Sequence, residues 1–230
     1  RRPIRVSGLC EGVLPLFCAA ISDSPRRTLI LCPDDAEARK TASFISSLDR
    51  ECAFYPARDY NFNNILASHE FEHERLAVLY RMMKNDSFTV VSTPAAAFQL
   101  TMPPEKLAVR TIRLDRNSLI DTDELAIRLN GAGYRRCDMV ESCGQFALRG
   151  GIVDIYAPSM HPVRIELFGD EVDRMGYFSL ESQRFTGEET DSIEIPPTLE
   201  VILGDEERRI LRESVTRQIS RVKGSAAEQT

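Results

Sequence analysis

Residues 143–185, CGQFALRGGIVDIYAPSMHPVRIELFGDEVDRMGYFSLESQRF, restrict the fold of this chain more than any other stretch. Along residues 163–168, side chains alternate at the period of two that directs one set to a core and the other to solvent. The core set is Val163, Ile165 and Leu167, and the solvent set is Arg164, Glu166 and Phe168. Gly169-Asp170 then supplies a turn, so residues 171–178 return as the partner of a hairpin. The stretch predicts three or four short antiparallel strands.

Phe168 is the unusual member of the solvent set. We predict that its ring lies in water beside Arg164 unless a partner covers it, since the two residues are four apart on one strand and share a face. Arg149 can lie on this face too if the strands that carry these residues pair. Protein interfaces concentrate their binding energy in a few aromatic and Arg side chains, and Arg suits bidentate contacts with carboxylates. Arg149, Arg164 and Phe168 are therefore candidate partner-binding residues.

A second interpretation of these residues needs no partner. Arg164 could form an ordinary surface ion pair with Glu166 or Asp173, worth under about 1 kcal/mol. Phe168 could turn into a local cluster of side chains. The alternation by itself leaves both interpretations open.

Three segments carry a resemblance to a known family, namely RGGIVDI at 149–155, PVRIELFGDEVD at 162–173 and SQR at 182–184. Together they resemble the UvrB-homology module at the N-terminus of the bacterial transcription-repair coupling factors, and the excision-repair protein UvrB carries a related block. The resemblance implies an α/β fold, with a RecA-like parallel sheet lobe that has helices on both faces and carries an inserted small α+β domain with an antiparallel sheet. It also implies domain bounds of 1–108, 109–190 and 191–230, the last being a truncated return segment toward the first lobe.

The same resemblance implies a function. The family's module recruits UvrA to lesions where RNA polymerase has stalled, in nucleotide excision repair, and its UvrA contacts match Arg149, Arg164 and Phe168. The parent protein is expected to be an ATP-dependent DNA translocase, with ATP and magnesium in its motor and with RNA polymerase and double-stranded DNA bound by other domains. None of the motor motifs occurs in this chain. The alternative within the same repair system is a fragment of UvrB, which verifies damage with ATP.

The first glycine turn bears on nucleotide binding. A P-loop needs G-x-x-x-x-G-K-[ST], because backbone N–H groups surround the phosphates, Lys contacts the β/γ oxygens and Ser or Thr binds magnesium. Here Gly8 and Gly12 are one residue too close, and Val13 and Leu14 stand where Lys and Ser or Thr are needed. We therefore expect a strand over 3–8 and a helix over 13–21 that keep the shape of a phosphate loop without binding nucleotide. In the family this site is degenerate as well, whereas UvrB keeps a functional one.

The segment His69-Glu70-Phe71-Glu72-His73 fits the zinc-peptidase pattern H-E-x-x-H. Such a site requires a third protein ligand, and the only other histidine is His161, far along the chain. The histidines and glutamates instead read as the solvated flank of a helix from Ser68 to about residue 84, whose apolar stripe packs on a core. A zinc hydrolase is thus a remote alternative, and we expect no metal.

Elsewhere the pattern predicts strands and helices in alternation, the order typical of a parallel sheet with helices on its faces. The expected strands are 28–32, 52–55, 88–92, 109–114 and 192–195, and the expected helices are 36–48, 68–84, 95–100, 121–130 and 205–222.

Composition narrows the functional class. A net charge of −6 argues against a general nucleic-acid surface, which needs clustered Lys and Arg. The six cysteines are scattered without a C-x-x-C, so free thiols are expected rather than a disulfide or zinc framework. No signal peptide or long apolar span occurs, which predicts a cytoplasmic protein with no membrane contact. The first residue is Arg1, so we expect a fragment of a longer protein.

Overall fold

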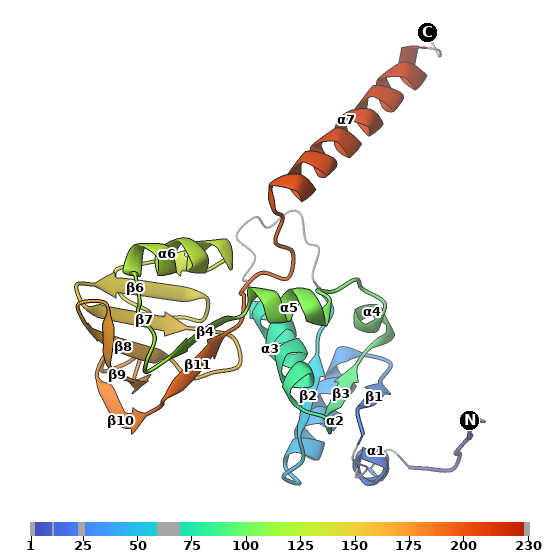
Figure 1. Cartoon of the computed structure of the whole chain (residues 1–230). Coiled ribbons are helices and arrows are strands. Elements are labelled where there is room, and N and C mark those ends of the chain that lie inside the picture. The colour runs from blue at the N-terminus through green and yellow to red at the C-terminus, as the bar shows by residue number, and fades with distance from the viewer. Residues whose placement is uncertain (1–2, 11, 23–25, 59–69, 228–230) are drawn as a thin grey trace. The chain divides into compact units, whose positions relative to one another are not determined.

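The polypeptide forms a mixed structure of helices and several sheets, seen in a computed structural model that describes residues 3–10, 12–22, 26–58 and 70–227 (Figure 1). It divides into two units, residues 1–200 and 201–230. The first unit contains a parallel lobe and an α+β domain, each with its own apolar core. The second unit is formed mainly by the helix α7 (Asp205–Ala227).

The parallel lobe is built on a three-stranded sheet in the order β1-β3-β2. Its strands are β1 (Thr28–Leu31), β2 (Cys52–Tyr55) and β3 (Thr89–Ser92), as the sequence predicted to within a residue. One face packs on α1 (Leu14–Ser22) and α2 (Asp35–Ser46), and the other on α3 (Glu70–Lys84) and α4 (Pro94–Ala97). The expected parallel sheet with helices on both faces is therefore present.

The strand expected over residues 3–8 is absent. Residues 3–10 are exposed coil, and their backbone joins none of the strands described above. Gly8 has a φ of 82°, the left-handed region that glycine adopts without steric cost. The turn closes where the Val13 N–H donates to the Cys10 carbonyl oxygen, and α1 begins at the next residue. Because the segment pairs with no strand in the described part of the chain, its apolar residues Ile4 and Val6 remain exposed.

A short helix, α5 (Pro104–Arg110), occupies the start of the strand expected over 109–114. Proline fits the first turn of a helix because its missing N–H has no helical acceptor there and its φ is already helical. Leu107 anchors the helix in the interior of the lobe. The strand itself is β4 (Ile112–Asp115), so the prediction was wrong for residues 109–111 and right for 112–114.

The α+β domain is built on a six-stranded sheet in the order β10-β9-β8-β7-β6-β5 (Figure 1). Its strands are β5 (Arg135–Arg136), β6 (Gln145–Arg149), β7 (Ile152–Tyr156), β8 (Val163–Phe168), β9 (Glu171–Phe178) and β10 (Phe185–Glu189). The strands β6 to β10 are successive antiparallel neighbours, more than the three or four expected, and the predicted return strand over 171–178 is confirmed.

One face of this sheet, here called the inner face, is covered by α6 (Thr122–Gly131) and by a two-stranded ribbon of β4 and β11 (Ser192–Ile195). Leu125 and Leu129 of α6 enter the same core as Ile193 and Ile195 of β11. The strand over 192–195, which we had expected in the return segment, thus belongs to the core of the α+β domain.

Where the chain returns from this domain to the parallel lobe, Glu200 forms a buried ion cluster with residues of that lobe, here called the Glu200 clamp. Glu200 accepts hydrogen bonds from the guanidinium groups of Arg75, at 2.9 and 3.0 Å, and of Arg58, at 2.8 Å, and from the Thr101 hydroxyl. The Glu200 backbone N–H donates to the Glu72 carboxylate at 2.6 Å. The side chains of Arg75 and Glu200 are both fully buried, so the charges are paired out of water.

The described helices include none that is both long and apolar enough to cross a bilayer. The six cysteines are free, as expected, and Cys18, Cys32 and Cys52 are buried. Burial raises the pKa of the Cys52 thiol to about 11, which keeps it protonated near neutral pH.

Candidate partner-binding surface

The candidate site residues lie on the face of the six-stranded sheet opposite to α6, here called the outer face. The inward side chains of the strands, such as Phe146, Val153 and Ile165, fill the domain core. Because side chains alternate along a strand, Arg149 and Arg164 point to the outer face. Strand register pairs Arg149 with Ile152, and Ile152 with Glu166. Arg164 precedes Glu166 by two residues on β8, so the two side chains share this face.

Asp154 is the centre of this face. It pairs in register with Arg164, and its carboxylate is fully buried. Arg164 donates from Nε to Oδ1 at 2.7 Å and from Nη2 to Oδ2 at 2.9 Å, a bidentate contact. Arg149 donates from Nη2 to the same Oδ2 at 2.5 Å. One carboxylate therefore holds two guanidinium groups from the strands on either side of it.

Arg164 is not a surface residue, which corrects the prediction that it lies in solvent beside Phe168. It is only 8% exposed, and its guanidinium stacks over the Phe178 ring with 4.9 Å to the ring centre. The hydrogen bonds from Arg164 to Asp154 outweigh its burial and raise the pKa of the guanidinium further. The alternative partners weighed from the sequence, Glu166 and Asp173, are also wrong, because the ion pair is formed with Asp154.

Residues 179–184 explain why this part of the outer face is covered. They fold back over the sheet, and the Gln183 carbonyl accepts a hydrogen bond from Arg164 Nη1 at 3.0 Å. The Gln183 side chain donates to the carbonyl oxygens of Val140 and Leu180 at 3.0 and 2.8 Å. The alternation along β8 predicts the face of the sheet on which Arg164 lies, but it does not predict that a loop covers that face.

Phe168 and Arg149 remain accessible at one end of the outer face. Phe168 is 83% exposed, as predicted, and the Arg149 side chain is 40% exposed. The Leu167 N–H donates to the Gly151 carbonyl oxygen at 2.7 Å, which brings the β6–β7 turn against the end of β8. A Cβ at Gly151 would meet the Leu167 carbonyl oxygen at 2.7 Å, so this approach requires glycine.

Asp154 was missed by the sequence reasoning. A signal was present, because an aspartate inside the apolar run IVDIY is expensive to bury unless a cation meets it. Pairing that strand with PVRIE in antiparallel register would have placed Arg164 opposite. The sequence would then have predicted that Arg149 and Phe168 are exposed and that Arg164 is buried behind them.

The remaining sequence candidates do not form a second site. Gly8, Val13 and Leu14 lie in the coil and first residue of α1, where Val13 and Leu14 offer no ammonium group or hydroxyl to a phosphate. His69 lies outside the described residues, and Glu72 of the same motif is engaged with the Glu200 backbone. Within the described ranges, no three His, Cys, Asp or Glu side chains gather as a metal site would require.

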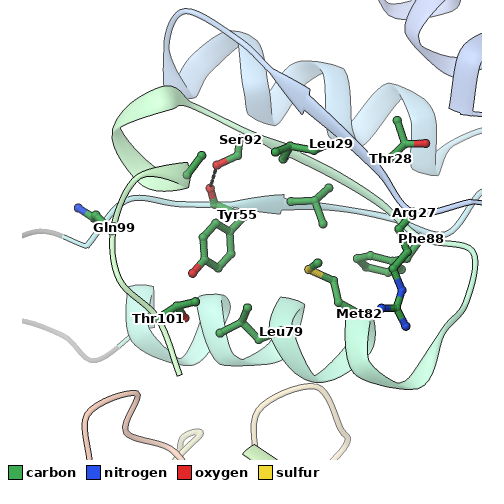
Figure 2. Close-up of a pocket in the computed structure, with 12 residues that line it drawn as sticks. Arg27, Thr28, Leu29, Tyr55, Leu79, Met82, Phe88, Ser92, Gln99 and Thr101 are labelled. Carbon is green, nitrogen blue, oxygen red and sulfur yellow. Dashed lines mark hydrogen bonds between the residues drawn. The ribbon is translucent and has the colours of Figure 1, made fainter. Parts of the chain in front are cut away.

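The parallel lobe contains a separate pocket of about 240 Å³ between its sheet and α3. Figure 2 shows Tyr55, Leu79 and Met82 pointing into it, with the Ser92 hydroxyl donating to the Tyr55 carbonyl oxygen at 2.8 Å. The described residues that line it are mostly apolar and include no carboxylate or histidine, the side chains that most often act as general bases.

Comparison with known proteins identifies the domain that carries this surface. Residues 112–200 match the family model of the UvrB interaction domain. The chain is 34% identical over 215 residues to the transcription-repair-coupling factor of Bacillus subtilis, which covers 91% of this chain and 18% of the relative. It is 24% identical over 199 residues to that of Haemophilus influenzae, covering 85% and 17%. With that of Mycobacterium tuberculosis it shares 40% identity over 96 residues, covering 41% and 8%.

The chain spans less than a fifth of the length of these curated relatives. The matched range 112–200 begins at β4 and ends at the Glu200 clamp, so it coincides with the α+β domain that exposes Arg149 and Phe168. The chain therefore carries a UvrB interaction domain within a UvrB-homology module of the kind found in the transcription-repair-coupling factors.

Proposed function

We propose that this chain is a non-catalytic UvrB-like module that recruits the damage-recognition protein UvrA in nucleotide excision repair. The observation that carries the proposal is Phe168, a large aromatic side chain 83% exposed on the same sheet face as the partly exposed Arg149, in a domain of the UvrB interaction family. Aromatic and Arg residues dominate binding energy at interfaces, so an exposed ring and an exposed Arg on one sheet face are candidate contacts for a partner.

The two accessible residues and Arg164 have different roles in this proposal. Phe168 supplies the apolar contact, and Arg149 offers its exposed N–H groups to a carboxylate of UvrA. Arg164 is a positioning residue, because it neutralises Asp154 and so fixes the carboxylate that orients Arg149. Arg164 therefore affects binding through the position of Arg149 and makes no contact with UvrA itself.

The parallel lobe serves as a scaffold in this function. Its strand and helix order supports a degenerate RecA-like lobe, and Val13 and Leu14 supply neither the phosphate-binding lysine nor the magnesium ligand. For the parent protein we propose an ATP-dependent DNA translocase that displaces stalled RNA polymerase, with ATP, magnesium, polymerase and double-stranded DNA bound outside these 230 residues. The similarity to the coupling factors supports this assignment.

The test is calorimetric titration of the chain with UvrA. Phe168→Ala is expected to weaken binding by about 2 kcal/mol or more, roughly thirtyfold, with an unchanged melting temperature. Phe98→Ala is the matched control, because Phe98 is comparably exposed but lies in the parallel lobe. Arg149→Ala is paired with Arg39→Ala, since Arg39 also combines a half-exposed side chain with an ion pair. Equal affinity of the Phe168 variant and the wild type would refute the proposal.

A further inference from the structure

Leu119 lies next to the proposed surface and belongs to none of the apolar clusters given above for the described residues. It is 76% exposed, whereas the following residue, Ile120, is buried in the domain core. Leu119 forms an isolated antiparallel bridge with Glu171, and Glu171 pairs with Phe168. Residues directly opposite each other in antiparallel pairs project to the same face. Phe168, Glu171 and Leu119 therefore form one row across the end of the outer face.

The spacing of this row suits a single contact. Neighbouring strands are about 4.8 Å apart, so the two apolar side chains are separated by about 10 Å, a distance that one partner surface can span. At this end of the sheet the Gly169-Asp170 turn joins β8 to β9, and the Ile120 N–H donates to the Asp170 carbonyl oxygen at 2.7 Å. Leu119 thus widens the proposed surface in the direction away from Arg149.

The backbone around Leu119 is fixed before any partner arrives. The Ser118 N–H donates to the Asp115 carbonyl oxygen and the Asp115 N–H to the Ser118 hydroxyl, at 2.9 and 3.0 Å. Two residues after Leu119, Asp121 caps α6 by accepting from two backbone N–H groups. A preorganised backbone holds the Leu119 side chain at one position on the sheet, which lowers the conformational entropy lost on binding.

Glu171, between the two apolar side chains, specifies the chemistry of the partner. It is exposed and forms no ion pair with any residue that the structure describes. An apolar surface that covered Phe168 and Leu119 together would also cover this carboxylate, which is costly unless a cation meets it.

We propose that Leu119 and Phe168 form a paired apolar anchor, and that it docks on an apolar protein surface with a Lys or Arg opposite Glu171. The inference rests on the proposed function and adds to it a second anchor and the charge of the facing group. It makes Leu119 and Glu171 determinants of which partner surface fits this end of the sheet.

The experiment is titration of the 230-residue chain with UvrA, comparing wild type, Phe168→Ala, Leu119→Ala and Leu119→Glu, with a thermal melt of each. Ile127→Ala and Ile127→Glu are the matched controls, because Ile127 is comparably exposed but lies on α6, across the sheet from the outer face. Leu119→Ala is expected to raise Kd about five- to tenfold and Leu119→Glu about a hundredfold, since a charge would be forced into an apolar contact. The controls and all melting temperatures should stay at wild-type values.

Glu171→Gln provides the second measurement. It is expected to raise Kd about fivefold at low salt and less at high salt, because the lost interaction is a partly screened ion pair. Wild-type affinity of both Leu119 variants, with Phe168→Ala weakened, would overturn this inference and leave the proposed function standing. Absence of binding by the wild-type chain would overturn both.

Discussion

Replacing Glu200 by Gln should cost the chain about 3 kcal/mol of folding free energy at pH 7. The substitution keeps the shape of the side chain but removes the negative charge from between Arg75 and Arg58. The Arg75 guanidinium, which is fully buried, would then lack an anion. Removing one partner of a buried ion pair typically costs about 3–5 kcal/mol, because the other charge is left uncompensated.

The pKa of Glu200 gives a second route to this magnitude. Burial alone raises the pKa, but hydrogen bonds from Arg75, Arg58 and Thr101 outweigh it, and the pKa falls from 4.5 to about 2. That difference corresponds to about 3 kcal/mol. Since the folded-state pKa lies below the unfolded one, this stability is fully present above pH 4.5 and is lost as the pH falls toward 2.

The assay is urea unfolding followed by circular dichroism, with wild type and Glu200→Gln measured at pH 7, 5, 4 and 3. The stability difference should stay near 3 kcal/mol at pH 7 and 5 and shrink to about 1.4 kcal/mol at pH 3, by proton linkage. Glu213→Gln is the matched control, because Glu213 pairs with Arg209 on the exposed surface of α7 at 2.7 Å. Its effect should stay below about 0.5 kcal/mol.

Two outcomes would refute this reasoning. A loss of less than about 1 kcal/mol at pH 7 would mean that the cluster contributes little beyond the cost of its own burial. A loss that stayed constant from pH 7 to pH 3 would mean that packing, and not the charge of Glu200, is responsible.

Three further predictions concern the other sequence candidates. Arg164→Ala should lower the free energy of unfolding by about 3 kcal/mol, because it leaves the fully buried Asp154 carboxylate without its main partner. Phe168→Ala should change the free energy of unfolding by less than about 0.5 kcal/mol, because the ring is exposed. Equal melting temperatures of the two variants would contradict the assignment of Arg164 to the interior. Calorimetry with Mg-ATP should detect no binding to the chain, since Val13 and Leu14 replace the phosphate and metal ligands, and a micromolar Kd would show the opposite. Elemental analysis should find no stoichiometric zinc, and one zinc per chain that disappears in His73→Ala would revive the metal site.

The sequence predicted local elements well where one pattern acts alone. The alternation over 163–168 and the Gly169-Asp170 turn gave the β8–β9 hairpin, and residues 52–55 and 192–195 were placed to the residue. The start of β4 was misplaced because Val109 continues an apparent alternation, although Pro104 is well suited to the first turn of a helix.

The candidate surface was predicted in part. Phe168 is exposed as the alternation implied, but the position of Arg164 depends on Asp154 in the next strand and on residues 179–184 above it. The Glu200 clamp joins residues 125 positions apart, and no local pattern marks such a pair. Burial of a charge is decided by tertiary contacts, which periodicity does not record.

The ribbon of β4 and β11 gives the α+β domain the topology of a removable cassette. Ile112 lies directly opposite Ile195 in register, so the polypeptide enters and leaves the domain through neighbouring positions. A transplant of residues 112–195 into another host would therefore need only a short, undistorted junction. The same cut would leave Glu200 with the donor lobe, whereas a cut after Glu200 would deprive Arg58 and Arg75 of their counter-ion. The choice of splice site thus determines whether Arg58 and Arg75 of the remaining lobe keep their counter-ion.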